Sequence, residues 1–228
     1  DMGSRTVVAT FGEGCYFAGY DVALPTEYAY KSKSEGGIWE EGDLRRDESI
    51  RYDFTYLGIT PTEVSWGADE LDPHIKKYED ERTDQFNGNL ANEWYSGKNF
   101  IVLRYADVLL CYAECLNELG ETGQANTIVN QVRARAWGGT LPNEMAWNYG
   151  QDEFRTQIMN ERIRELCFEG WRRMDLIRTG KFVELIKERN SWAKKSGTIK
   201  DFHMRYPIPD TEIKNNDDIS EEDQNPGY

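Results

Sequence analysis

Glu161-Arg-Ile-Arg-Glu-Leu-Cys-Phe-Glu-Gly-Trp-Arg-Arg-Met-Asp-Leu-Ile-Arg-Thr-Gly180 is a segment in which acidic and basic residues alternate around one central glycine. The charges recur at helical spacing, with Glu161, Arg162, Arg164 and Glu165 before Gly170 and Arg172, Asp175 and Arg178 after it. This spacing predicts a ladder of ion pairs that cross-links two helices bending at the glycine. Because such charge clusters are often structural, we assign no catalytic residue here.

The composition predicts a folded acidic protein. The chain has 228 residues, 39% hydrophobic and 13% aromatic, and a formal net charge of -14. This hydrophobic content argues against disorder. Phosphate binding requires clustered Lys and Arg, and we find no basic stripe with interleaved aromatic residues. Nucleic acid is therefore excluded as an expected partner.

No apolar run approaches 18 residues, so the sequence predicts no membrane span. The first residues, Asp1-Met-Gly-Ser-Arg-Thr6, lack the pattern of a targeting signal. The four cysteines show no zinc-binding spacing, and we expect buried apolar thiols: Cys15, Cys111, Cys115 and Cys167. Cysteine usage leaves the cellular compartment open.

Three segments differ in character. Residues 1–99 are rich in Gly, Tyr, Trp and acidic residues, which predicts loops, short helices and a small β-hairpin. Tyr52, Phe54 and Tyr56 alternate there as in a short strand. Residues 100–195 carry helical periodicity, and residues 196–228 form a predicted extended acidic tail.

The helical segment begins with a predicted hairpin. A helix from Phe100 to Leu119 has polar residues on one arc and apolar residues elsewhere, so we expect it to be mostly buried. Gly120 ends it, and a second helix is predicted from about Thr122 to Ala136. Ala113 and Ala125 stand where these helices would approach each other, as in a tetratricopeptide unit. Because one such unit cannot bury its own face, we expect other elements to cover it.

Three more helices are predicted, each with an apolar stripe: Gln151 to Phe168, Gly170 to Arg178 and Lys181 to about Lys195. The fold class is therefore mainly α, a tetratricopeptide-like helical hairpin with further helices and irregular loops. The tail contains Tyr206-Pro-Ile-Pro209, and restricted residues before proline favour an extended chain.

Several separate motifs resemble the SusD/RagB family. They are Gly42-Asp-Leu-Arg-Arg-Asp47, Arg104-Tyr-Ala-Asp-Val-Leu-Leu110, Val132-Arg-Ala-Arg135, the Glu161 to Arg178 block, Tyr206-Pro-Ile-Pro209 and Gln224-Asn-Pro-Gly-Tyr228. Their order matches the C-terminal half of that family, and the resemblance covers the chain from about residue 21. It implies one SusD/RagB C-terminal domain with a SusD-like α-α superhelix.

The resemblance also implies a function without chemistry. Members are outer-membrane lipoproteins on the extracellular face of Bacteroidetes-type bacteria, where they bind nutrients, typically glycans, for a SusC-like TonB-dependent transporter. Some members bind peptides, so a peptide-binding or protein-interaction module is the alternative. Family proteins are about twice as long, and we expect the missing N-terminal half, or a companion chain, to cover the hairpin. The lipid anchor is not visible in this chain.

Sugar binding requires flat aromatic surfaces with polar groups beside them. Trp66, Trp94, Tyr95 and Trp39 stand among polar residues in predicted loops, where binding residues are frequent. Trp66 is the preferred platform, because Gly67 follows it. For each of the four, core packing is the alternative. Four other tryptophans lie in or beside helices and are predicted to pack there: Trp137, Trp147, Trp171 and Trp192.

Catalytic and cofactor sites find little support. The two histidines, His74 and His203, lie near no nucleophile motif. Gly12-Glu-Gly14 lacks the third glycine of a dinucleotide site. The acidic run Asp217–Asp223 lacks the spacing of a calcium loop, so a solvated tail is favoured. We expect no enzymatic activity, no cofactor and no metal, although glycoside hydrolysis by two carboxylates stays open.

Overall fold

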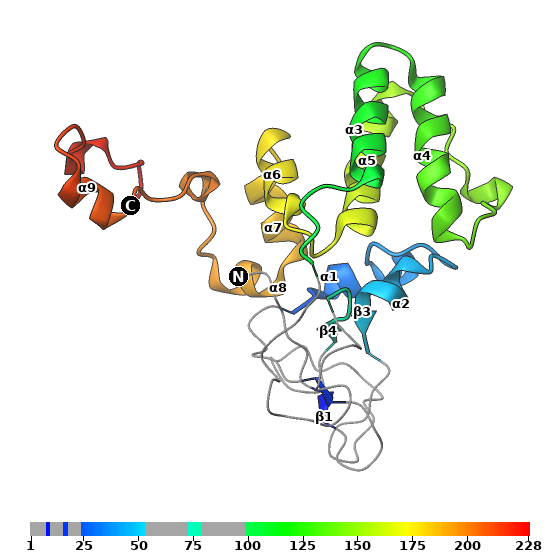
Figure 1. The fold of residues 1–228 in the computed structure, drawn as a ribbon, viewed down its shortest axis with the longest axis horizontal. Helices are drawn as coiled ribbons and strands as arrows, with labels where there is room; N and C mark the ends of the chain where they lie inside the picture. Colours follow the sequence, from blue (N-terminus) through cyan, green and yellow to red (C-terminus); the bar gives the residue numbers. More distant parts are fainter. Residues whose placement is uncertain (1–7, 10–15, 18–23, 53–72, 79–98) are drawn as a thin grey trace. The chain divides into compact units, whose positions relative to one another are not determined.

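The computed structural model describes residues 8–9, 16–17, 24–52, 73–78 and 99–228. Internal contacts divide the chain into two compact units, Asp1–Arg172 and Arg173–Tyr228. The mainly α fold class is confirmed (Figure 1). These units are defined by contacts, whereas the three predicted segments (1–99, 100–195 and 196–228) were defined by composition, so the segments stay a prediction.

A helical hairpin forms the centre of the first unit. Helix α3 (Tyr105–Glu118) packs against α4 (Thr122–Ala136), and α5 (Gln151–Leu166) lies alongside α3 (Figure 1). Ala113 and Ala125 are fully buried, as predicted for the approach of the two helices. The shared core contains Leu110, Leu116, Val129, Val132, Trp147, Phe154, Ile158 and Leu166. Helix α5 therefore supplies part of the cover that the hairpin needs.

An extended segment before α5 is held by polar side chains of α4. The amide of Asn126 bonds both backbone groups of Tyr149, at 2.9 and 3.2 Å, and that of Asn130 does the same at Trp147, at 3.1 and 2.8 Å. The Arg133 guanidinium donates to the carbonyl of Met145 at 2.8 Å. Side chains on one face of a helix recur every three or four residues. Successive turns of α4 therefore contact every second residue of the segment that runs alongside it.

A second core lies in the N-terminal part of the first unit. It contains Ile38, Trp39, Ile50 and Cys167, with Tyr28, Tyr30 and Tyr52 packed around it. Four short elements form this part of the chain: α1 (Glu27–Tyr30), η1 (Lys33–Glu35), α2 (Arg45–Ser49) and β3 (Ile50–Arg51). Strand β3 pairs antiparallel with β4 (His74–Ile75), and β1 (Val8–Ala9) with β2 (Tyr16–Phe17). Tyr52 follows β3, whereas Phe54 and Tyr56 lie outside the described residues.

Two helices differ from the predictions by more than a shift of one or two residues at an end. Helix α3 begins at Tyr105 rather than Phe100, because Arg104 is extended (φ -139°, ψ 158°) and its side chain bonds Glu169 at 2.7 Å. The helix expected over 181–195 is divided into α7 (Phe182–Arg189) and α8 (Ser191–Ser196). Asn190 separates them because its side chain accepts a hydrogen bond from the amide of Ala193 at 2.9 Å, as an N-cap does.

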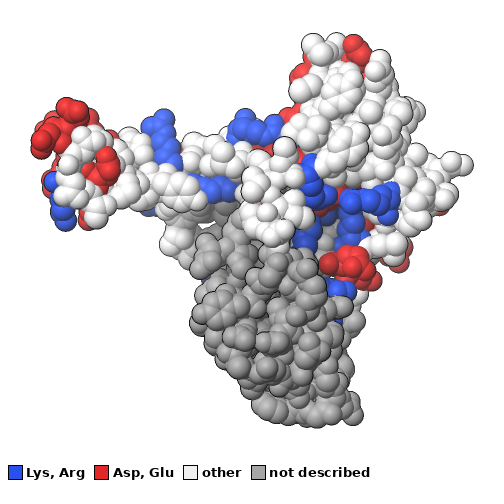
Figure 2. All heavy atoms as spheres, in the orientation of Figure 1, with Lys and Arg blue, Asp and Glu red and all other residues white. Residues whose placement is uncertain are grey.

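The prediction that the first helix is mostly buried is wrong. Its polar Asp107 is buried because it pairs with Arg162 at 2.8 Å, so this side of the helix faces inward. Large apolar side chains instead face outward along α3 and the segment before it: Phe100, Ile101, Val102, Leu103, Tyr105, Val108, Tyr112 and Leu119. We call these eight residues the α3 outer face. The visible side of the hairpin carries few charged side chains over most of its length (Figure 2).

The second unit is built of short elements. Part of α6 (Trp171–Arg178), then α7, α8, η4 (Asp201–Met204), α9 (Asp210–Asn215) and η5 (Glu221–Asp223) follow one another. The end of the chain folds back, since the Gln224 amide bonds both backbone groups of Ile208, at 2.8 and 3.0 Å. The Tyr228 hydroxyl donates to the carbonyl of Arg205 at 2.8 Å. The tail is therefore less extended than its proline pattern predicted, because the side chains of its last residues bond the backbone before them.

Two further predictions fail at the surface. Cys111 and Cys115 are exposed, because they lie on the outward side of α3, while Cys167 is buried as expected. Trp192 is 61% exposed on the short helix α8. Trp147 is buried as predicted, and Trp171 packs partly buried against the main core.

Candidate functional site

The predicted ligand-binding residues lie in different parts of the chain. Trp66, Trp94 and Tyr95 fall outside the described residues. Trp39 lies in the second core, 2% exposed, and its indole nitrogen donates to the carbonyl of Ala29 at 2.6 Å. Its edge contributes to the wall of a hollow of about 320 Å³, with Tyr149 and Glu40 beside it. A ring this buried presents almost no face for a sugar to stack on, so its placement favours packing.

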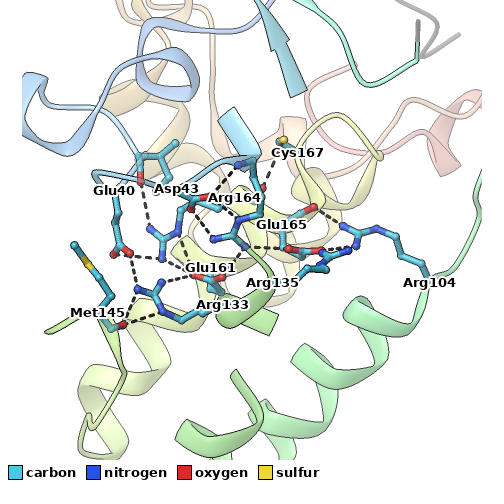
Figure 3. A network of polar contacts seen from close by, with 12 residues as sticks. Glu40, Asp43, Arg104, Arg133, Arg135, Met145, Glu161, Arg164, Glu165 and Cys167 are labelled. Carbon is cyan, nitrogen blue, oxygen red and sulfur yellow. Dashed lines mark hydrogen bonds and ion pairs between the residues drawn. The ribbon is translucent and has the colours of Figure 1, made fainter. Parts of the chain in front are cut away.

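The charged residues of the family motifs converge on Glu161 of α5 (Figure 3). One carboxylate oxygen accepts a hydrogen bond from Arg45 at 2.7 Å, and the other accepts from Arg133 at 2.9 Å and Arg164 at 2.7 Å. The side chain is completely buried. A buried carboxylate requires such partners, because an unpaired charge in the interior is very unfavourable.

Glu165, one turn further along α5, forms a second centre. Arg45 donates to one oxygen at 2.9 Å, and Arg104 and Arg135 both donate to the other. Beside it, Glu169 pairs with Arg104 at 2.7 Å and with Lys77. The side chain of Glu165 is 1% exposed. These contacts join α5 to the α2 segment, the start of α3 and the end of α4.

The surrounding arginines control the ionisation of both carboxylates. Burial raises the pKa of Glu161, but the charges of Arg45, Arg164 and Arg133 outweigh it and hold the pKa well below the usual range. Burial likewise raises the pKa of Glu165, and Arg45 and Arg104 lower it overall. Both groups are therefore ionised at neutral pH, and neither can act as a general acid.

A cavity of about 470 Å³ lies beside Glu165. Four cations line it, namely Arg45, Lys77, Arg104 and Arg135, together with the carboxylates Glu48, Glu165 and Glu169. Apolar surface comes from Leu44, Tyr78, Ile101 and Ala136. Its volume falls within the range of roughly 300–1,000 Å³ that is typical of small-molecule sites. Figure 2 shows Lys and Arg side chains gathered next to acidic ones below the helical hairpin.

The ladder predicted from Glu161 to Arg178 captured only part of this arrangement. Arg45, Arg104, Arg133 and Arg135 complete it, and each lies 28 to 120 residues away in the sequence from the glutamate that it contacts. Helical spacing cannot reveal partners at such separations. A signal did exist, because each of these arginines belongs to one of the motifs that carry the family resemblance.

Comparison with known proteins gives one consistent result. The model of the SusD family matches residues 18–228. SusD-like protein P2 of Formosa agariphila is 31% identical over 222 residues, covering 93% of this chain and 41% of the relative. The starch-binding protein SusD of Bacteroides thetaiotaomicron is 28% identical over 159 residues, covering 68% of this chain and 26% of that protein.

A solved structure supports the same relation. A SusD homologue from Bacteroides thetaiotaomicron superimposes with a TM-score of 0.64 at 26% identity, covering 82% of this chain and 41% of that one. The chain thus spans less than half the length of each of these three proteins. None of the helices in the described part of the chain is long and apolar enough to cross a membrane.

Proposed function

Because this chain belongs to the SusD family, we propose that it binds glycan nutrients at the cell surface without cleaving them and delivers them to a SusC-like TonB-dependent transporter. The observation that carries the proposal is the family match over residues 18–228, together with a relative named for starch binding. The proposed location is the extracellular face of the outer membrane.

The charge network supports a role without chemistry. Retaining and inverting glycosidases need one carboxylic acid whose pKa is raised, so that it protonates the leaving group. Glu161 and Glu165 have the opposite property, because their pKa values are lowered and every carboxylate oxygen accepts from an arginine. Within the described residues this pair therefore acts as a structural clamp between helices.

The sugar platform is proposed to lie in the aromatic loops. Trp66 and Trp94, with Tyr95, stay the candidates, whereas the core position of Trp39 removes most of its exposed surface. We expect Trp66→Ala and Trp94→Ala to weaken glycan binding while thermal stability is unchanged. Trp39→Ala is the matched control, and we expect it to lower the melting temperature instead. Equal loss of stability in all three variants would place the first two in the core.

The decisive experiment is calorimetric titration against polysaccharides, oligosaccharides and peptides, with an assay for new reducing ends. Saturable binding of one glycan class without new reducing ends supports the proposal. Release of reducing ends would establish a hydrolase, and binding of peptides alone would establish the alternative function. The remainder of a longer protein, or a companion chain, is proposed to be needed for full affinity and should be supplied in a parallel titration.

The alternative, a peptide-binding or protein-interaction module, has one observation in its favour. The α3 outer face exposes apolar residues such as Val102 at 72% and Tyr112 at 50%, and exposed apolar surface of this kind marks interaction sites. Helix α4 argues against peptide binding. Its Asn126 and Asn130 could bond the backbone of a peptide, but they already bond an extended segment of the same chain. We propose that the α3 outer face contacts an N-terminal half of the same protein or a companion chain.

A further inference from the structure

The cavity beside Glu165 has more positive than negative groups in its wall. Four cations and three carboxylates line it, in a chain whose formal net charge is -14. The three carboxylates are Glu48, Glu165 and Glu169, and the last two are held by arginines. A local excess of positive charge inside a strongly acidic protein favours a ligand that carries a negative charge.

The arginines of the cavity wall differ in how many of their N–H groups already donate to carboxylates. Arg104 uses its guanidinium on both Glu165 and Glu169, and Arg45 uses its own on Asp43, Glu161 and Glu165. Arg135 donates from one terminal nitrogen to Glu165, and this is the one polar contact of its side chain among the described residues. An arginine has five N–H donors, so most of those on Arg135 are available.

Arg135 is also accessible. Its side chain is 64% exposed, whereas those of Arg45 and Arg104 are 11% and 20% exposed. It extends from the end of α4 next to Ala136 and contributes to the cavity wall. A guanidinium held through one nitrogen can still bind a second carboxylate through its other nitrogens, and such pairs are charge-assisted.

The remaining wall suits a sugar ring. Tyr78 is fixed, because its hydroxyl donates to the carbonyl of Phe168 at 3.0 Å and its ring stacks on Phe100 with centroids 6.3 Å apart. Leu44 and Ile101 add apolar surface. Pyranose rings present C–H faces to aromatic and aliphatic groups while their polar substituents form hydrogen bonds.

From these observations we infer that the cavity between Arg135, Arg104, Lys77 and Tyr78 is a binding subsite for the carboxylate of an acidic sugar, such as a uronic acid residue of a glycan. Arg135 binds the carboxylate through its unoccupied nitrogens, and Tyr78 contacts the ring. Glu165 keeps Arg135 in place. This inference rests on the proposed glycan binding and adds a preference for acidic chains.

The test compares two oligosaccharides that differ in the carboxylate alone. Oligogalacturonate and its carboxyl-reduced counterpart are titrated calorimetrically into the 228-residue chain, at low and high NaCl. We expect the acidic form to bind at least about tenfold more tightly, because a charged hydrogen bond is lost in the reduced form. The preference should shrink at high salt, since screening weakens exposed charge pairs.

Arg135→Gln should abolish this preference, because the glutamine side chain carries no positive charge to pair with the carboxylate. The fold should survive, since Glu165 keeps Arg45 and Arg104. Arg155→Gln is the matched control, because Arg155 is 45% exposed and pairs with Glu118 and Asp152 outside the cavity wall. If the glutamine variant is unstable, Arg135→Lys serves in its place. Because lysine keeps the charge, this variant should retain part of the preference for the acidic form.

The outcomes separate the two proposals. Equal binding of both oligosaccharides, or a preference that survives Arg135→Gln in a folded protein, overturns the acidic subsite and leaves glycan binding intact. Binding of no glycan in the wider panel overturns the proposed function, and the subsite with it. A preference lost in Arg155→Gln as well would show a general charge effect and contradict the assignment to this cavity.

Discussion

Glu161 illustrates how one residue connects distant parts of the chain. Its two oxygens accept from Arg45, Arg133 and Arg164, which come from three different segments. Ion pairs of this kind contribute little net stability compared with a well-packed apolar core, but breaking them by removing one partner is strongly destabilising. The residue therefore specifies which segments meet.

Glu161→Gln should destabilise the protein by about 3–5 kcal/mol, because it leaves the buried Arg133 and Arg164 and the mostly buried Arg45 without their shared carboxylate. Chemical unfolding in urea measures this change. Asp152→Asn on the same helix is the control, since its side chain is 94% exposed and, among the residues that the structure describes, pairs with the partly exposed Arg155 alone. We expect the control to stay within about 0.5 kcal/mol of the parent. Similar values for both variants would contradict the role assigned to Glu161.

Acid should destabilise the first unit through the same residues. The pKa values of Glu161, Glu165 and Glu40 are lower in the folded state than the ordinary value of 4.5. A carboxylate of lowered pKa stabilises the fold fully above its unfolded pKa, and this stabilisation is lost as the pH falls toward the folded value. Stability should thus fall below about pH 4.5.

Melting temperatures between pH 7 and pH 3 measure this dependence. Glu165→Gln removes one of the titrating groups, so its melting temperature should be lower at pH 7 and should fall less steeply in acid. Parallel curves for the parent and this variant would show that Glu165 does not contribute to the acid sensitivity. Asp152→Asn again serves as the control with an exposed group.

At the scale of elements, polar side chains determine where helices begin and end. Arg104 is drawn to Glu165 and Glu169, so α3 starts five residues later than its apolar pattern predicted. Asn190 caps α8 and divides a predicted single helix. In both places a side-chain contact competes with helix propensity, which is a weak preference.

The C-terminal Asn-Pro-Gly-Tyr segment depends on its glycine. Gly227 has φ +99°, and a Cβ there would lie 2.4 Å from the Phe202 ring. Gly227→Ala should therefore destabilise the second unit by more than the roughly 1–2 kcal/mol that a positive φ alone imposes on alanine. Hydrogen exchange of residues 202–228 measures the effect in this unit.

Gly197→Ala is the matched control, since Gly197 also has a positive φ, +64°, but no atom lies within 4 Å of the added carbon. The difference between the two variants isolates the steric overlap with Phe202. If both variants raise exchange equally, the close approach of Gly227 to the ring does not stabilise the tail.

At the scale of the whole molecule, the α3 outer face is an apolar surface left uncovered in the described structure. Eight large apolar residues from Phe100 to Leu119 are 45–76% exposed. Exposed apolar patches promote association unless a partner covers them. We expect the 228-residue chain to self-associate at high concentration.

Val102→Glu with Tyr112→Glu should shift the chain toward monomer in sedimentation velocity, because two charges then interrupt the outer face. Thr127→Glu with Gln131→Glu is the control, since it adds the same charge to exposed positions of α4 without removing apolar surface. If both double variants shift equally toward monomer, the added net charge explains the shift and the outer face does not. A parent chain that stays monomeric at high concentration would contradict the prediction.

The helices were largely predictable from the sequence because an apolar stripe recurs with the period of the helix. The α4 and α5 segments, the turn at Gly120 and the close approach at Ala113 and Ala125 follow from that local pattern and were confirmed. The family was also identified from the sequence, since its motifs are short and contiguous. Trp66, Trp94 and Tyr95 stay predictions, because they lie outside the described residues.

Which charged groups meet could not be derived from spacing, because Arg45 and Glu165 are 120 residues apart and are brought together only by the folded chain. The same applies to the cavity beside Glu165, whose wall combines the segments around residues 45, 77, 104 and 135. The sequence by itself thus determined the mainly helical fold class, the α4 and α5 segments and the family. Long-range packing decided that Trp39 is buried, that the α3 outer face is exposed and that Arg135 lies at a cavity, because burial depends on neighbours that are distant in the chain.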